Sequence, residues 1–286
     1  MGLQIVPNHY YSPLADVDRL GKTKKVWAHK SDLPGVAYDL DEQVENIRTI
    51  CLPFRDEYSG NSNYFKAIEM DLGMGFGEIE AQVLHGVVRH FQPRRIVEVG
   101  GGVSTYCMLK ALDLNGRGSI TCIEPYPSDS LRKLGDIELV VEPVQLIEGK
   151  VFTDLSRGDL LYIDSSHTVK PGSDVNHLVL DVLPRLGDGV LVHFHDIYLP
   201  YDYQVDVLNT VFQWSETSLL RAFLINNNGV GIIFCLSQLH HERLDDLKMI
   251  FPDYDPLLLI DGLSDSSPPW VQQFPSSIYL EISKNL

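Results

Sequence analysis

The pattern of apolar and polar positions changes character near residue 75 of this 286-residue chain. Before that point, prolines and glycines interrupt short periodic segments, and residues 40–52 form the main amphipathic helical pattern. From Glu78 onward, apolar residues recur at helical spacing until Pro93 ends the helix. We therefore expect an irregular N-terminal cap that contributes to substrate binding, residues 1–74, followed by a regular domain, residues 75–286.

Short apolar runs alternate with helical patterns throughout the second part. Strands are expected at Arg95–Val99, Ser119–Ile123, 144–147, Leu160–Ile163, 190–194, 230–236 and Ile278–Ile282, and helices at 103–114, 176–186 and 205–224. This alternation indicates parallel βαβ units in a doubly wound sheet, and the continuous apolar strands indicate helices on both faces. Residues 237–275, rich in proline, are interpreted as an insertion before the last strand.

Composition and charge narrow the range of partners. The formal net charge is −16, from 39 acidic and 23 basic residues. This excess repels phosphate backbones and anionic lipid surfaces, so neither nucleic acid nor a membrane is expected as a partner. Four scattered cysteines form no CxxC pair, and the first residues lack a basic and then apolar leader pattern. A reduced, cytoplasmic protein is expected.

The turn after the first strand is a candidate binding site. Gly100, Gly101 and Gly102 permit a tight turn and close approach of a ligand to the backbone. Ser104 lies at the start of the next helix, where backbone N–H groups are free to bind a ligand. Thr105 stands where a dinucleotide fingerprint requires glycine or alanine, which disfavours an NAD-dependent dehydrogenase.

Two carboxylates flank this turn in the expected sheet. Glu98 precedes the first glycine by two residues and can turn toward a cationic ligand group. Glu124 ends the second strand, where an acidic residue can accept hydrogen bonds from a ribose diol. Alone, each fits an ordinary loop or strand residue. Together with the glycine turn they favour an adenosine-type ligand.

Polar side chains also follow the fourth and fifth expected strands. Asp164 and His167 follow one strand, and His195 and Asp196 end the other. Because parallel strands end at the same edge of a sheet, these four side chains are expected to converge. They could hold a divalent cation, or a histidine could take a proton from a substrate hydroxyl. A purely structural polar cluster is the less favoured interpretation.

Other aromatic and histidine side chains have simpler interpretations. Tyr201 and Tyr203 follow the fifth strand and are expected to wall a substrate pocket. His193 lies within that strand and is interpreted as a core histidine with satisfied hydrogen bonds. His240 and His241 lie in the insertion and are expected at the surface.

Four stretches of the chain resemble class I S-adenosylmethionine-dependent methyltransferases. They are residues 75–105, which contain EVGGGVST, 158–176, which contain YIDSSHT, 183–203, which contain HFHDI, and 214–224. Within that class the chain resembles the small-molecule branch related to cephalosporin hydroxylase-like and rhamnosyl O-methyltransferase-like proteins. The resemblance covers residues 75–236 and the last strand.

The resemblance implies a Rossmann-like seven-stranded sheet with six parallel strands and an antiparallel last strand. It assigns the methionine part of the cofactor to Glu98 and the glycine turn, and the ribose to Glu124. Residues 149–152, with Val151, would flank the adenine. Asp164 would border the cofactor, and Asp164 and Asp196 match positions that hold magnesium in metal-dependent relatives.

His195 departs from those relatives, because a carboxylate or amide is usual at its position. This departure favours His167 or His195 as a catalytic base. The alternative is a site for Mg²⁺ or another divalent cation formed by Asp164, His195 and Asp196.

The leading hypothesis is O-methylation of a small-molecule, sugar or peptide acceptor. The alternatives are a metal-dependent hydroxylase-like or hydrolytic enzyme on the same fold, and a non-catalytic binding protein. The cap and the insertion also offer surface for a second copy of the chain, so a homo-oligomer is compatible with the sequence.

Overall fold

The computed structural model describes residues 5–264 and 274–284. Their centre is a seven-stranded sheet with the strand order β3-β2-β1-β4-β5-β7-β6. The strands are β1 (Arg95–Val99), β2 (Ser119–Ile123), β3 (Glu138–Val140), β4 (Leu160–Ile163), β5 (Leu191–Phe194), β6 (Val230–Cys235) and β7 (Ile278–Ile282).

The direction of the strands confirms the expected sheet. Strands β1 to β5 pair in parallel, and β7 runs antiparallel to both of its neighbours, β5 and β6. Six strands therefore share one direction and β7 opposes them. The fold is a Rossmann-like, doubly wound α/β sheet.

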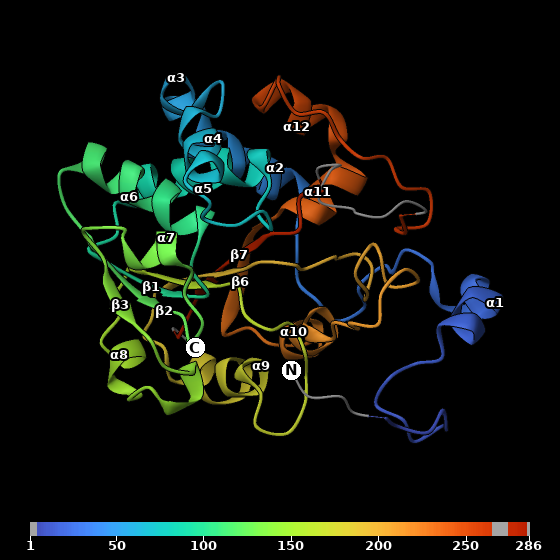
Figure 1. The fold of residues 1–286 in the computed structure, drawn as a ribbon. Coiled ribbons are helices and arrows are strands. Elements are labelled where there is room, and N and C mark those ends of the chain that lie inside the picture. Colours follow the sequence, from blue (N-terminus) through green and yellow to red (C-terminus); the bar gives the residue numbers. More distant parts are fainter. Residues whose placement is uncertain (1–4, 265–273, 285–286) are drawn as a thin grey trace.

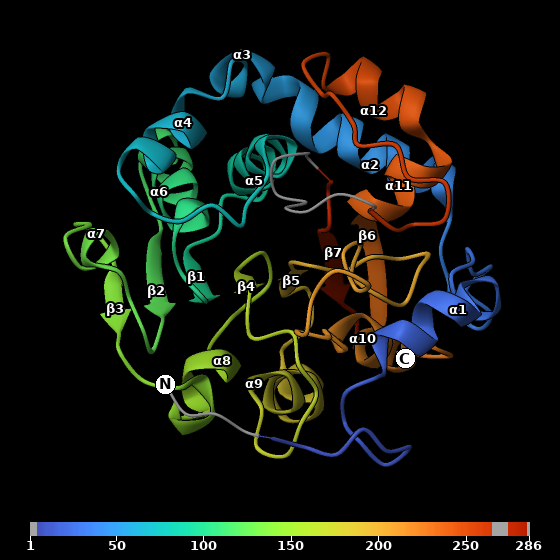
Figure 2. The same ribbon diagram turned by 45° about the vertical axis from the view of Figure 1, so that its right-hand side comes forward.

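Helices cover both faces of the sheet (Figures 1 and 2). One face carries α2 (Leu40–Cys51), α4 (Ser62–Glu69), α5 (Glu78–Phe91) and α6 (Val103–Asn115). The opposite face carries α8 (Lys150–Thr153), α9 (Asp174–Asn176) and α10 (Glu216–Leu224). The remaining helices are α1 (Val17–Trp27), α3 (Arg55–Tyr58), α7 (Asp129–Arg132), α11 (Leu236–Glu242) and α12 (Leu244–Ile250).

Alternate residues of each central strand enter different cores. On β1, Ile96 joins the cluster under α5 and α6, whereas Val97 and Val99 join the cluster on the opposite face. Strands β4 and β5 are buried at every position. Burial of both faces explains why these strands are continuous apolar runs in the sequence. Among the described residues, no helix is long and apolar enough to cross a membrane.

The region before residue 74 contains more helix than its turn-forming residues predict. Besides the expected α2, it contains α1, α3 and α4. Ile47 and Ile50 of α2 are buried against α5 and the end of β6. The apolar side of α2 therefore belongs to the same packed body as the sheet.

The third strand was expected at residues 144–147, but the structure has it earlier, at Glu138–Val140. Strand β3 pairs with β2, whereas Val144–Leu146 forms a short 3₁₀ helix that starts directly after Pro143. Proline has no backbone N–H and a fixed φ, which favours a turn at this point. The expected helix at 176–186 is present, but it consists of α9, a π-helical stretch His177–Val182 and a 3₁₀ turn.

The long helix expected at 205–224 exists only in its second half, as α10. In the first half, tertiary hydrogen bonds replace helical ones. The Val205 carbonyl accepts from Ser264 N at 2.6 Å, and the Gln204 side chain accepts from Trp214 N at 2.7 Å. Val205 and Val207 are buried in this loop, whereas Val211 and Phe212 are exposed, so the apolar spacing here does not mark one face of a helix.

Candidate active site

The carboxyl ends of the four central parallel strands lie in register. Val99 pairs with both Ile123 and Ile163, and Ile163 pairs with Phe194. The residues that follow, one per strand, are therefore neighbours along a single edge of the sheet. They are Gly100, Glu124, Asp164 and His195. The structure brings together the strand-end residues singled out by the sequence.

The glycine turn is packed tightly between neighbouring segments. Gly100 has φ +83°, and a Cβ there would lie 1.9 Å from the Asp164 carbonyl oxygen. A Cβ on Gly101 would lie 2.3 Å from the Cys122 sulfur. These two glycines are needed for contacts within the protein, whether or not a ligand approaches the turn.

Glu98 lies underneath the turn and is fully buried. Its carboxylate accepts hydrogen bonds from the Ser104 hydroxyl at 2.6 Å and the Thr105 hydroxyl at 2.7 Å. Burial raises the pKa of Glu98 to about 8, although these hydrogen bonds oppose the shift. Thr105 stands where a dinucleotide fingerprint requires glycine or alanine. In this structure its side chain supports the turn, because its hydroxyl also accepts a hydrogen bond from Gly102 N.

Glu124 has a more accessible position at the end of β2. One of its oxygens accepts a hydrogen bond from Tyr126 N at 2.7 Å, and the side chain is only partly buried. Val151 lies on α8 and is also partly buried. Both residues stay candidates for the adenosine half of a ligand.

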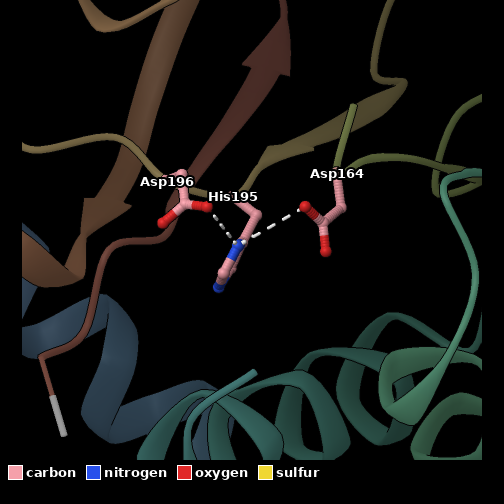
Figure 3. A group of neighbouring side chains, drawn as sticks. All are labelled: Asp164, His195 and Asp196. Carbon is pink, nitrogen blue, oxygen red and sulfur yellow. Dashed lines mark ion pairs between the residues drawn. The ribbon is translucent and has the colours of Figure 1, made fainter. Parts of the chain in front are cut away.

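Asp164, His195 and Asp196 form a compact group on the same edge (Figure 3). One donor atom from each residue lies within 4.8 Å of the others. His195 Nδ1 is 3.6 Å from Asp164 Oδ1 and 3.4 Å from Asp196 Oδ2. This nitrogen is buried and has no hydrogen-bond partner among the described residues. The Asp164 side chain is 31% exposed, so a ligand can reach the group.

His167 joins the group from the loop after β4. Its Nε2 lies 3.3 Å from one oxygen of Asp164 and 3.3 Å from one oxygen of Asp196. Its carbonyl accepts hydrogen bonds from Ser215 N and Glu216 N, which ties the loop to the start of α10. His167 and Asp196 both have φ +56°, a left-handed conformation uncommon for residues other than glycine.

The carboxylates and imidazoles of the group shift one another's pKa values toward the charged forms. Burial lowers the pKa of His167, but Asp196, Asp164 and Glu216 outweigh it and raise the pKa to about 10. The pKa of His195 is also raised, because nearby carboxylates outweigh its burial. Burial raises the pKa of Asp164, but the two imidazoles outweigh that and hold the pKa well below its usual range.

A comparison with known protein families bears directly on this edge of the sheet. Residues 97–197 match a family model described as a methyltransferase domain. This segment is therefore similar to a methyltransferase domain. The match begins within β1, contains β2 to β5 and ends one residue after Asp196, and it confirms the resemblance to methyltransferases.

Individual proteins are similar to this chain over different lengths. An uncharacterised protein of Archaeoglobus fulgidus is 29% identical over 163 residues, which cover 52% of this chain and 72% of that protein. The structure of the Podospora anserina methyltransferase PaMTH1, bound to SAH, is 15% identical and covers 99% of this chain and 100% of its own, with a TM-score of 0.43. The structure of the O-methyltransferase TomG from Streptomyces achromogenes, in complex with SAM, is 16% identical. The match covers 84% of this chain and 98% of TomG, with a TM-score of 0.46.

Two buried glutamates outside the matched methyltransferase segment complete the group. Glu80 of α5 lies 3.2 Å from His195 Nε2, and Glu216 of α10 lies 2.8 Å from His167 Nδ1. The sequence analysis missed both, although a signal exists. Each glutamate starts an i, i+4, i+8 row that is otherwise apolar, with Leu84 in one helix and Leu220 in the other.

Among the three tyrosines that closely follow β5, Tyr198 reaches the group. Its hydroxyl donates to Asp196 Oδ1 at 2.7 Å. Tyr201 and Tyr203 lie farther along the chain, where Tyr203 donates to the Asp261 carbonyl and stacks edge-on against Trp27. Tyr203 therefore lies between α1 and the insertion. The role of the two tyrosines as a pocket wall stays a prediction.

Three other histidines differ from expectation. His193 is a core residue stacked on Tyr162 at 4.0 Å, but neither ring nitrogen has a partner among the described residues, so the expected satisfied state is wrong. Burial lowers its pKa well below the usual value. His240 is buried and bonded to the Tyr254 hydroxyl, and His241 is partly buried. The insertion packs against the domain, which explains why these histidines are not surface residues.

Proposed function

We propose that this protein is an S-adenosylmethionine-dependent methyltransferase that methylates an oxygen atom of a small-molecule, sugar or peptide acceptor. The observation that carries the proposal is the row formed by Gly100, Glu124, Asp164 and His195 at the ends of four registered strands. It combines a tight turn, a ribose-binding type of carboxylate and a proton- or metal-binding group on one edge, within the segment that matches a methyltransferase domain.

The residues of this edge fit the cofactor chemically. A helix of 13 residues, α6, begins at the glycine turn and offers its N-terminal N–H groups. The partly exposed Glu124 has an oxygen left to accept hydrogen bonds from a ribose diol, and partly exposed Asp164 is an anion suited to a cationic ligand group. Because Glu98 is buried under the turn, we propose that it acts by holding the turn in shape.

Bound S-adenosylmethionine would supply a methyl group on a sulfonium centre. The contribution of this chain is then to position an acceptor oxygen for in-line attack and to accept its proton. Two histidines and two aspartates converge on this edge. Because the raised pKa of His167 keeps its imidazole protonated at neutral pH, we propose that the proton is accepted by the carboxylate of Asp164 or Asp196. A divalent cation held by Asp164, His195 and Asp196 would make the acceptor hydroxyl more acidic. The unpartnered Nδ1 of His195 fits that cation.

The cap and the insertion are proposed to select the acceptor. Lys24 of α1 forms an ion pair with Asp261 of the insertion at 2.7 Å, and Trp27 packs against Tyr203. These contacts join the two regions beside the chain segment that follows β5. We also propose that residues 1–74 form a cap on the domain of residues 75–286.

Titration calorimetry with S-adenosylmethionine and with its demethylated product tests the cofactor. We expect both compounds to bind, and Glu124→Ala to weaken both about 10- to 100-fold, because hydrogen bonds to a charged group are lost. Glu45→Ala, on an exposed position of α2, is the matched control and should leave the affinity unchanged. Absence of binding by the unaltered protein would refute the proposal.

A further inference from the structure

Two imidazole nitrogens and two carboxylate oxygens alternate around one small ring. His167 Nε2 lies 3.3 Å from both Asp164 Oδ1 and Asp196 Oδ2. His195 Nδ1 lies 3.6 Å and 3.4 Å from the same two oxygens. Ligand atoms about 2.0–2.2 Å from a common metal ion in a tetrahedral arrangement are about 3.3–3.6 Å apart. The four imidazole–carboxylate distances therefore match those between donors around a single cation.

We propose that His167 is a fourth ligand of a metal centre whose other ligands are Asp164, His195 and Asp196. With two imidazoles in the set, the centre is suited to Zn²⁺, Co²⁺, Mn²⁺ or Fe²⁺ and poorly suited to Mg²⁺, which prefers ligand sets made only of oxygen. The inference extends the proposed function, in which a cation at this edge acidifies the acceptor hydroxyl. It makes His167 a ligand and not a free base.

The buried Nδ1 of His195 makes no hydrogen bond to the described residues, although the Asp164 and Asp196 oxygens lie within ion-pair distance of it. The His195 side chain is 2% exposed. Figure 3 shows it directed between the carboxylates of Asp164 and Asp196. A buried polar atom without a partner is unfavourable, and a cation between these carboxylates would supply one.

Two outer carboxylates orient the imidazoles toward the ring. Glu80 lies 3.2 Å from His195 Nε2, and Glu216 lies 2.8 Å from His167 Nδ1. A metal-bound histidine usually donates its other ring N–H to a carboxylate, which fixes the tautomer and leaves a lone pair for the metal. Both histidines have this arrangement. Glu80 and Glu216 are therefore positioning residues.

The orientation of Glu80 does not depend on His195 alone. Its carboxylate also accepts hydrogen bonds from Gly77 N at 3.1 Å and from Ser276 N at 3.0 Å. Glu80 thus links α5, the segment just before β7 and the strand end that carries His195. Four carboxylates surround two imidazoles in this group, so a bound divalent cation also reduces the repulsion among them.

Titration of the chelator-treated full-length protein with Co²⁺, followed by visible absorption, tests the ligand set. We expect saturable absorption bands from Co²⁺ bound by the unaltered protein. His167→Gln should weaken Co²⁺ binding at least about 100-fold and change the bands, and Glu216→Gln should weaken it about 10- to 100-fold. His29→Gln, at an exposed histidine, is the matched control and should behave like the unaltered protein.

Unchanged Co²⁺ affinity and bands in His167→Gln would overturn the assignment of this ligand. The choice of metal has its own test: Mg²⁺ should compete with Co²⁺ only at about 100-fold higher concentration or above. Equal competition would overturn the transition-metal assignment.

A measurement on the unaltered protein covers the case in which the variants fail to fold. Pulsed electron paramagnetic resonance of the Mn²⁺-loaded protein should detect two coordinated imidazole nitrogens, and one or none would overturn the proposal. Calorimetry with S-adenosylmethionine on the same samples separates the two ideas. Cofactor binding without metal binding refutes only the metal centre, whereas metal binding without cofactor binding refutes only the methyltransferase.

Discussion

Glu98 illustrates how the surroundings of one residue change its chemistry. In the sequence it is an acidic residue at a strand end, available to a cationic ligand. In the structure it is buried under the glycine turn, where two hydroxyl groups occupy its oxygens. Desolvation penalises the charged carboxylate more than these hydrogen bonds stabilise it, so its pKa rises to about 8.

Substitution of Glu98 by glutamine should therefore stabilise the protein at neutral pH. The pKa of Glu98 is about 8 in the folded chain against an ordinary value of 4.5, so between these values the folded state binds more protons than the unfolded state. The stability of the unaltered protein then falls as pH rises from 4.5 to 8. Glu98→Gln should remove this dependence and gain roughly 3 kcal/mol at pH 7, with little gain below pH 4.5.

Urea unfolding between pH 4 and pH 8 measures this effect. Glu45→Gln, at an exposed position on α2, provides the control and should follow the unaltered protein. Parallel pH profiles for Glu98→Gln and the unaltered protein would contradict the burial argument. A loss of cofactor affinity in Glu98→Gln, despite the gain in stability, would indicate that the charge itself contributes to binding.

At the scale of elements, the turn from β1 to α6 is fixed by backbone packing. Gly100 combines a positive φ with direct contact against the carbonyl of Asp164, one residue beyond β4. The turn that is proposed to receive the cofactor is thereby coupled to the strand end that carries the Asp/His group.

Gly100→Ala should destabilise the protein by roughly 2–4 kcal/mol, because the methyl group requires both a strained φ and a shift of the neighbouring strand end. Gly149→Ala is the comparison: its φ is −55°, and a Cβ there meets no described atom within 4 Å. That variant should stay within about 1 kcal/mol of the unaltered protein. Equal urea midpoints for the two variants would show that the turn can relax.

At the scale of the whole molecule, buried polar contacts join the N-terminal region to the far end of the sheet. Gln43 of α2 accepts a hydrogen bond from Cys235 N at 2.8 Å and donates to the Gln238 side chain at 3.0 Å. Asn46 donates to the Ile233 carbonyl at 3.0 Å. These contacts connect the start of the chain with β6 and α11.

Gln43→Met should lower the free energy of unfolding by about 2 kcal/mol, because it leaves the buried Cys235 N–H without its acceptor. Glu45→Met, at an exposed position on the same helix, should change it by less than about 0.5 kcal/mol. Circular dichroism and tryptophan fluorescence should report one shared transition during urea unfolding, since α2 and the sheet share a core. A separate early transition for the N-terminal region would contradict this view.

The sequence by itself determined the central strands and the edge on which the candidate site lies. The bounds of β1, β2, β4 and β7 follow from short apolar runs ended by polar or turn residues, a signal contained within about five positions. Since parallel strands end on the same edge, the convergence of Asp164, His167, His195 and Asp196 was also predictable. Helices α2, α5 and α6 follow from their periodicity and their start and stop residues.

Only the tertiary structure decided what surrounds that edge. Glu80 and His195 are 115 positions apart, and His167 and Glu216 are 49 apart, so no local pattern links them. Glu80 also accepts from Gly77 N at the start of its own helix, and this local role does not reveal the contact with His195, which only packing creates. The same reason applies to the loop after residue 204 and to the burial of Glu98. In each case long-range contacts, formed when the helices pack on the sheet, outweigh the local preference of the chain.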